Sequence, residues 1–148
     1  MPINFKSKTF YRVIDANINR AREGLRVCEE FSRFILNDYR LTFRLKNIRH
    51  RLQEIVSRLP IKEFRLIEER NSAQDVGKDI LAKETDRDSY PAILLANLGR
   101  VKESIRVLEE FTKLIQRNSA LKFKEIRYAI YDVEKKLVKK IKALRNIR

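Results

Sequence analysis

An all-α helical bundle, built from two duplicated helical hairpins, is the fold class that this sequence predicts. Three observations carry the prediction. The chain of 148 residues contains only 3 Gly and 3 Pro, so few residues interrupt a helix. Hydrophobic residues make up 43% of it, which is enough for a core. Residues 16–31 are also repeated, with substitutions, in residues 96–111. We therefore expect one domain covering 1–148.

The repeat gives the clearest internal signal. Both copies contain the pattern Ala-Asn-x-x-Arg-x-x-Glu-x-x-Arg-Val-x-Glu-Glu-Phe, 80 positions apart. Further along, Ile48-Arg49-His50 corresponds to Ile126-Arg127-Tyr128 after a slip of two residues. Each half therefore predicts a helix, a short turn and a second helix.

The first repeat, about 9–59, is expected to hold two helices. The first runs from about 9 to 36, with Thr9 or Ser7 as its N-cap. Asn and Asp then form a turn, and the second helix spans about 41–59 and stops before a proline.

A connector of about 60–88 separates the two repeats. Residues 61–70 predict a short helix, and 71–77 predict a loop because they contain turn formers and a glycine. A loop of this length in a compact bundle is more often functional than idle.

The second repeat is expected at about 89–145. Its first helix begins near Asp88 or Ser89, with Pro91 in the first turn, and ends near 117–118. Its second helix spans about 120–145.

Charge and composition limit the partners. The formal net charge is +14, which attracts polyanions and small phosphorylated metabolites. Lys and Arg mostly alternate with Glu and Asp, which argues against nucleic acid. The single cysteine fits a reducing compartment, and no stretch resembles a signal peptide or a membrane span. We therefore expect a cytoplasmic protein without a membrane partner.

Polar residues interrupt the apolar face of the first predicted helix. Asn17 and Gly24 fall in the middle of this face and Arg20 at its edge. Burying an unpaired polar group costs about 2 kcal/mol or more, so these groups need partners. Either they bond to groups across the bundle, or they and the small residue line a ligand cavity shared by the two halves. The second copy repeats the three positions as Asn97, Arg100 and Ser104.

Other polar residues allow two interpretations. Arg26 and Glu29 point away from the apolar face, as a solvated ion pair would, yet both recur in the second copy. His50 is the only histidine, and a lone histidine is more often packed or capping than catalytic. Cys28 aligns with Leu108 and predicts a core position, although counting alone leaves a Cys–His pair open.

Several familiar sites are excluded. A zinc or iron site is not expected, because no second His or Cys accompanies the first. The sequence contains no glycine-rich phosphate loop. Any phosphate would therefore be held by Arg and Lys side chains and by helix N-termini.

The repeated motif, preceded by Asp15, is similar to a known helical domain. So are Arg70 followed by Asp75-Val76-Gly77, and the pair Glu84-x-x-Arg87. Together they resemble the monofunctional hydroxymethylpyrimidine-phosphate (phosphomethylpyrimidine) kinase domain, found alone or fused N-terminal to thiamine-phosphate synthase. The resemblance spans roughly residues 10–138. This chain has Asn71-Ser72 where the family usually has Asp-Thr, so no acid stands at position 71.

The resemblance implies ATP-dependent phosphorylation of hydroxymethylpyrimidine phosphate to the diphosphate, with ATP and Mg²⁺ as cofactors. The attacking phosphate is largely ionised at neutral pH, so alignment and charge neutralisation matter more than a base. By motif position, catalytic roles fall to Arg20, Asp75 and Arg100, with Asp75 also as metal ligand. Substrate and phosphate binding falls to Asn17, Glu23, Arg49, His50, Arg70, Gly77, Arg87, Asn97, Glu103 and Arg127.

Three other interpretations remain. The chain could be a cofactor-free helical enzyme for a small dianion, which would not need ATP. It could be a basic nucleic-acid-binding module, which would show steep salt dependence. It could also be a non-catalytic binding or regulatory partner of thiamine-phosphate synthase, which would form a complex without turnover. The size of the bundle also suggests a homodimer.

Overall fold

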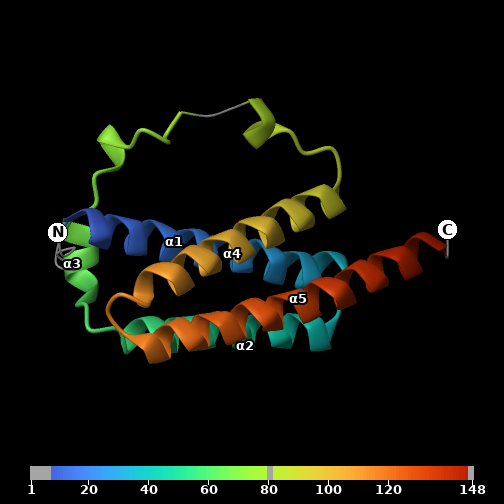
Figure 1. Cartoon of the computed structure of the whole chain (residues 1–148). Coiled ribbons are helices and arrows are strands. Elements are labelled where there is room, and N and C mark those ends of the chain that lie inside the picture. The colour runs from blue at the N-terminus through green and yellow to red at the C-terminus, as the bar shows by residue number, and fades with distance from the viewer. Residues whose placement is uncertain (1–7, 80–81, 147–148) are drawn as a thin grey trace.

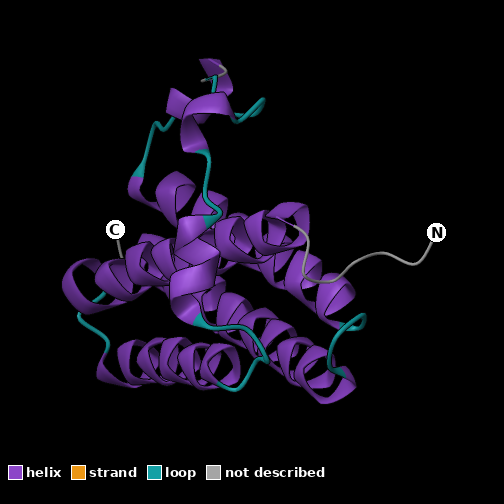
Figure 2. Ribbon diagram, turned by 90° about the vertical axis from the view of Figure 1, so that its left-hand side faces the viewer, coloured by secondary structure: helices purple, strands orange, loops and turns teal. Residues whose placement is uncertain are grey.

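The predicted all-α fold class is confirmed. The computed structural model describes residues 8–79 and 82–146, and every regular element in these ranges is helical (Figures 1 and 2). The α-helices are α1 (Lys8–Glu30), α2 (Tyr39–Ser57), α3 (Glu63–Glu68), α4 (Tyr90–Thr112) and α5 (Arg117–Asn146). A π-helical turn, Phe31–Ile35, extends α1, and two 3-10 turns, Ser72–Gln74 and Ala82–Thr85, lie in the connector.

The two repeats form two hairpins, α1–α2 and α4–α5, that pack into one bundle (Figure 1). The most extensive helix contact joins α1 to α4, the corresponding helices of the two repeats, while α2 packs on α5. Side chains at helical spacing fill the space between these helices. The largest fully buried ones include Ile14, Leu25, Leu45, Leu52, Leu98, Ile105, Leu108, Phe123 and Ile130.

Gly24 permits the close approach of α1 and α4. A Cβ added to Gly24 would lie 2.6 Å from Cγ2 of Val101 and 3.2 Å from the carbonyl oxygen of Asn97. In the second copy Ser104 is buried, and its hydroxyl donates to the carbonyl of Val101 at 3.0 Å. The prediction of a ligand cavity beside Gly24 is therefore wrong, because α4 fills that space.

Cys28 is a core residue, as predicted. Its side chain is fully buried, and burial raises the pKa of the thiol to about 12. The thiol is therefore protonated at neutral pH, whereas a nucleophilic cysteine needs a lowered pKa. His50 is exposed on α2 and the two make no hydrogen bond. The Cys–His pair that counting left open is excluded.

The end of the first helix differs from the prediction. The sequence predicts one α-helix to residue 36, but its last residues form the π-helical turn Phe31–Ile35, closed by Leu36 N–H donating to Phe31 O at 3.1 Å. Asn37 then takes a positive φ of 49°, a conformation that Asn tolerates after a helix. Ser7, one predicted N-cap, lies outside the described residues, and Thr9 lies within the first turn.

The first residues of α2 and α4 are set by the side chains that cap them. Asp38 accepts a hydrogen bond from Leu41 N at 2.9 Å, so α2 begins at Tyr39, earlier than predicted. Ser89 caps α4 as expected, accepting from Ala92 N at 3.2 Å.

The fourth helix ends sooner than predicted. It stops at Thr112 instead of near 117–118, and α5 already begins at Arg117. The amide of Gln116 donates to the carbonyl of Thr112 at 2.8 Å in the turn between them.

The connector leaves the bundle after α3. It arches along one side of α1 and α4 and reaches the start of α4 at the opposite end (Figure 1). Only the first part of this arch, which follows α3, contributes to the cavity described below. None of the helices in the described ranges combines the length and apolar character needed to cross a membrane.

Candidate functional site

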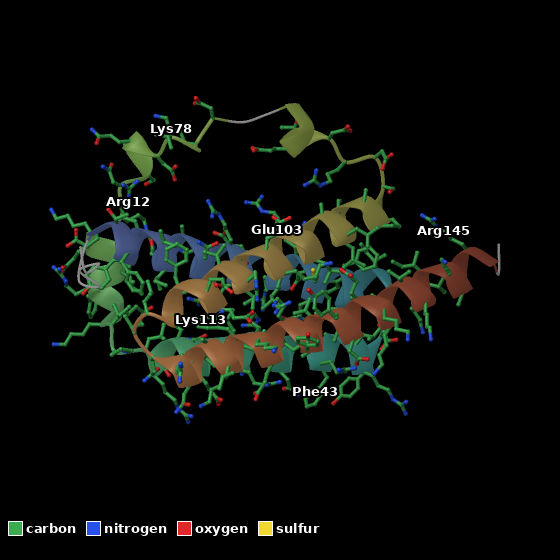
Figure 3. The ribbon with its side chains drawn as sticks, viewed as in Figure 1. Arg12, Phe43, Lys78, Glu103, Lys113 and Arg145 are labelled. Carbon is green, nitrogen blue, oxygen red and sulfur yellow. The ribbon has the colours of Figure 1, made fainter. Side chains whose placement is uncertain are left out.

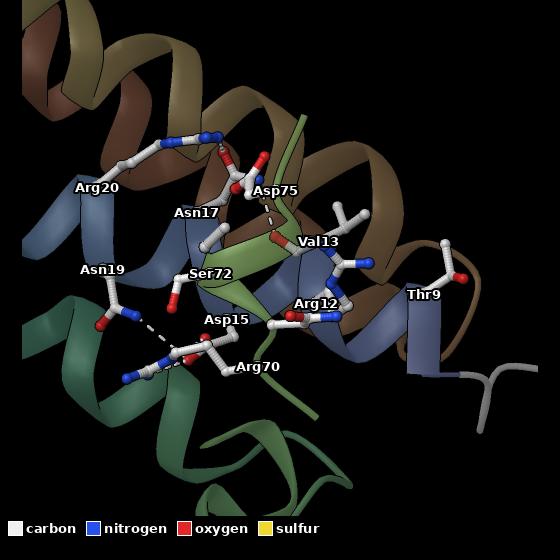
Figure 4. Close-up of a pocket in the computed structure, with 12 residues that line it drawn as sticks. Thr9, Arg12, Val13, Asp15, Asn17, Asn19, Arg20, Arg70, Ser72 and Asp75 are labelled. Atoms are coloured by element: carbon white, nitrogen blue, oxygen red, sulfur yellow. Dashed lines mark hydrogen bonds and ion pairs between the residues drawn. The ribbon is translucent and has the colours of Figure 1, made fainter. Parts of the chain in front are cut away.

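A cavity of about 420 Å³ lies between the first half of α1 and the start of the connector (Figure 4). Residues three or four apart on α1 share one face, so this helix supplies one wall. The connector after α3 supplies the opposite wall. The lining residues are Thr9, Arg12, Val13, Asp15, Ala16, Asn17, Asn19, Arg20, Arg70, Asn71, Ser72 and Asp75.

Asp15 and Arg70 join the two walls. Nε of Arg70 donates to Oδ2 of Asp15 at 2.7 Å, and Nη2 donates to Oδ1 at 2.8 Å. Oδ1 also accepts from the amide of Asn19 at 3.2 Å. These hydrogen bonds raise the pKa of the Arg70 guanidinium above its usual range. Both oxygens of the buried Asp15 are therefore occupied, and the connector is tethered to α1.

The buried amide of Asn17 is satisfied within its own helix. Nδ2 donates to the carbonyl of Val13 at 2.8 Å, and Oδ1 faces Nη1 of Arg20 at 3.5 Å. Asn97 repeats the first bond with the carbonyl of Ile93, also at 2.8 Å. One interpretation predicted that these amides bond to groups across the bundle. Both bond instead to the backbone carbonyl one turn earlier in their own helix. In the cavity, the side-chain oxygen of Asn17 helps to orient the guanidinium of Arg20.

Two arginines of the cavity have no carboxylate partner among the described residues. Arg12 and Arg20 are both exposed, and neither forms an ion pair there. The third arginine, Arg70, is neutralised by Asp15. The cavity therefore presents two guanidinium groups with free donors.

Asp75 stands on the connector wall. Its Oδ1 accepts from the amide of Gly77 at 2.8 Å, which closes a local turn, and its Oδ2 has no partner in the described part of the chain. The described ranges contain no group of three His, Cys, Asp or Glu that could hold a metal ion. A role for Asp75 in metal binding stays a prediction.

Arg49 and Arg127, both predicted to bind substrate, form equivalent ion pairs instead. Nε of Arg49 donates to Oε2 of Glu29 at 2.8 Å, and Nε of Arg127 donates to Oε2 of Glu109 at 2.9 Å. Both carboxylates are 4% exposed, so Glu29 is not the solvated residue that one interpretation predicted. These pairs join the two helices of each hairpin, and neither arginine lines the cavity.

The remaining predicted residues lie outside the cavity. His50, Arg100 and Glu103 are exposed on α2 and α4. Arg87 lines a separate groove beside the start of α4. Glu23 is close enough to contribute to the raised pKa of Arg70. The structure brings together Asn17, Arg20, Arg70 and Asp75, with Gly77 next to them, and roles for the others stay predictions.

Comparison with known proteins connects this cavity to a family. The sequence matches the ThiD2 family over residues 12–136. The chain belongs to the ThiD2 family. It is 40% identical over 129 residues to a thiamine-phosphate synthase of Nostoc punctiforme, covering 86% of this chain and 35% of that protein. It is 39% identical over 142 residues to a thiamine-phosphate synthase of Rhodopirellula baltica, and this match covers 95% of this chain and 37% of that protein.

These matches cover only part of each relative. The ThiD2 chain spans about a third of the length of the curated relatives that it matches. No solved structure matches it. The resemblance to a helical domain associated with thiamine-phosphate synthase is confirmed, and with it the connection to thiamine biosynthesis.

The predicted kinase activity is wrong by the same comparison. The relatives are named as thiamine-phosphate synthases, which are enzymes of a different kind. Neither these names nor the description of the ThiD2 family includes a kinase or ATP. What holds is the coarser statement that the relatives are enzymes of thiamine biosynthesis.

The sequence analysis missed part of the cavity of this ThiD2 chain. Arg12, Asn19 and Ser72 line it but were not predicted, and Asp15 appeared only as a motif residue. Arg12, Asp15 and Asn19 follow one another at intervals of three and four, which places them on one helix face. In the second copy these positions are Ala92, Leu95 and Gly99. A search for positions where the copies differ would have found them.

Proposed function

We propose that this chain is a ligand-binding helical domain that serves thiamine-phosphate synthase. Its α1–connector cavity binds a small phosphorylated aminopyrimidine. One observation carries the proposal: Arg12 and Arg20 point free donors at a cavity whose third arginine, Arg70, is neutralised by Asp15. Membership of the ThiD2 family supports the choice of a thiamine intermediate as the ligand.

The phosphate group is assigned to Arg12 and Arg20. A guanidinium presents two parallel N–H donors that match two phosphate oxygens, and such charge-assisted bonds are stronger than neutral ones. The cavity volume of about 420 Å³ suits a small metabolite. The net charge of +14 favours the approach of an anion.

The pyrimidine ring is assigned to the polar groups beside these arginines. Asn19 donates to Asp15 through Nδ2, which leaves its carbonyl oxygen available. Asn71 donates to Gln74 at 3.0 Å, which also leaves a carbonyl oxygen, and Ser72 adds a hydroxyl. An aminopyrimidine has both donors and acceptors on its edge, so these groups suit it.

Asp75 is the carboxylate of the cavity that fits Mg²⁺. Asp15 has both oxygens occupied, whereas Asp75 keeps Oδ2 unpaired among the described residues. Mg²⁺ in proteins is commonly held by one or two carboxylates together with substrate phosphates. A phosphate bound by the two arginines would supply those other oxygens.

Titration calorimetry tests the proposal with a matched pair of variants. The ligands are hydroxymethylpyrimidine monophosphate and, as a control, its unphosphorylated alcohol. Arg20→Gln removes a cavity arginine, and Arg100→Gln removes the exposed arginine at the same position of the second repeat. We expect Arg20→Gln to weaken binding of the monophosphate by about tenfold to a hundredfold. Arg100→Gln should change it by less than about twofold.

Each result has a defined meaning. The alcohol should bind much more weakly than the monophosphate, because it lacks the group that the arginines recognise. No binding of the monophosphate to folded protein would refute the proposed ligand. Equal losses in both variants would refute the assignment of the phosphate to the cavity between α1 and the connector.

A further inference from the structure

One end of the bundle exposes an unusual number of large apolar side chains. These residues, which we call the apolar end, lie where α1 meets α2, where α4 begins and where α5 finishes (Figure 1). Each is at least 42% exposed. The apolar end consists of Phe34, Ile35, Tyr39, Phe43, Tyr90 and Leu144.

The apolar end also contains a groove. Ile35, Tyr90 and Leu144 line a groove of about 900 Å³ between the π-helical turn and the facing ends of α4 and α5. Next to it, the rings of Tyr39 and Phe43 stack with centroids 6.1 Å apart (Figure 3 labels Phe43). Clustered apolar side chains of this kind on a surface mark an interaction site more often than scattered ones do.

Positive charge predominates beside the apolar end, although Asp88 also lines its groove. The guanidinium of Arg33 lies 4.8 Å from the centre of the Phe34 ring. A neighbouring cleft is lined by five cations but only one carboxylate, Asp38: the cations are Arg40, Arg44, Lys136, Lys139 and Lys140. Arg40 and Lys139 have no carboxylate partner among the described residues. A second copy of the chain would bring the same cations against these, which disfavours a homodimer through this face.

We infer that the apolar end is the docking face for a thiamine-phosphate synthase. The partner would supply an apolar surface with an acidic rim. The inference rests on the proposed link to that enzyme. About two thirds of the chain of each of these relatives has no match in this protein, so in them a homologous domain belongs to a larger enzyme. Apolar contact would give affinity, and the cationic rim would select an acidic partner.

Sedimentation velocity tests docking with the full chain. The probe is a whole thiamine-phosphate synthase whose own chain lacks a region similar to this protein. Tyr39→Ser alters the apolar end, and Phe64→Ser alters an aromatic residue on α3 at the opposite end. Both residues are 80% exposed, so the pair is matched. Thermal unfolding confirms that each variant is folded.

The expected result is a complex that Tyr39→Ser weakens by about tenfold or more and Phe64→Ser by less than about twofold. Raising the salt concentration should weaken the complex, because the rim acts through charge. No complex, or equal losses in the two variants, would overturn the inference. Self-association that Tyr39→Ser abolishes would overturn it in favour of a second copy. Monophosphate binding by Tyr39→Ser, measured separately, shows whether the proposed function stands without docking.

Discussion

The two repeats share their framework but not their cavity. Arg49 pairs with Glu29 in the first and Arg127 with Glu109 in the second, with Nε–Oε2 distances of 2.8 and 2.9 Å. Asn17 and Asn97 make the same bond, of 2.8 Å, to a carbonyl one turn earlier. These contacts are the same in the two copies.

Of the two repeats, only the first contributes to the cavity, together with the connector. Asp15 holds Arg70 there, whereas the corresponding residue of the second repeat, Leu95, is apolar and 49% exposed. Arg12 and Asn19 likewise correspond to an alanine and a glycine. The difference teaches that a recurring polar residue can serve the bundle, as Glu29 and Glu109 do, whereas Arg12, Asp15 and Asn19 occur only in the copy that has the cavity. Arg20 is the cavity residue that recurs, as Arg100, without a cavity around the second copy.

The largest expected effect concerns the buried ion pairs that both repeats contain. Glu29→Ala and Glu109→Ala each leave an arginine without its buried partner, and each should lower the free energy of unfolding by about 3 kcal/mol. Urea denaturation measures this. Glu30→Ala, which removes a partly exposed carboxylate next in sequence to Glu29, should cost less than about 1 kcal/mol. A large loss in only one repeat would break the comparison.

Glycine substitutions give the next effect, with opposite signs. Gly24→Ala places a Cβ 2.6 Å from Val101 and should destabilise the protein by about 1–2 kcal/mol. Gly99 has no atom within 4 Å of an added Cβ. Gly99→Ala should therefore stabilise the helix by about 0.5–1 kcal/mol. Thermal and urea unfolding of the two variants would contradict this account if both changes had the same sign.

Asp15→Asn sharpens the comparison at the cavity. It weakens the bidentate bond to Arg70 and should cost about 1 kcal/mol of stability, because that arginine is partly exposed. Hydrogen exchange in the connector should become faster, since the tether to α1 is weaker. Leu95→Asn, the matching change in the second repeat, should leave connector exchange unchanged. Unchanged exchange in Asp15→Asn would mean that other contacts hold the connector.

The smallest effect concerns pH. The amide of Leu41, helped by Lys140, holds the pKa of Asp38 below its ordinary value of 3.8. A carboxyl with a lowered pKa stabilises the fold above its unfolded pKa, and this contribution is lost as pH falls through the folded value. Asp38→Asn keeps a capping oxygen, so it should cost less than about 1 kcal/mol at neutral pH.

The measurement is urea unfolding of both proteins across the acid range. The difference between Asp38→Asn and the original chain should shrink as the pH falls below about 3.8. A difference that stays constant with pH would contradict an ionised cap.

The fold could be predicted because its signals are local. The repeat, the scarcity of Gly and Pro, and the cap at Ser89 indicate helices directly, and the structure agrees with them. The boundaries at Ile35 and Thr112 were missed because a π-helical turn and an early stop depend on bonds within the turn itself.

The site was harder to predict because its contacts are distant in sequence. Arg70 meets Asp15 across 55 positions, and no spacing rule reports such a pair. The repeat also drew attention to Arg49 and Arg127, whose recurrence reflects buried ion pairs. Recurrence is evidence of a common constraint, and in this fold that constraint is packing as often as ligand binding.

The crossing of α1 and α4 at Gly24 has a consequence for how the chain folds. Each hairpin places its principal apolar face against the other hairpin, so a single hairpin would leave that face in water. Folding of the two halves is therefore coupled, and unfolding should occur in one transition. By the same geometry, a chain that carried one hairpin would cover this face only by pairing with a second copy of itself.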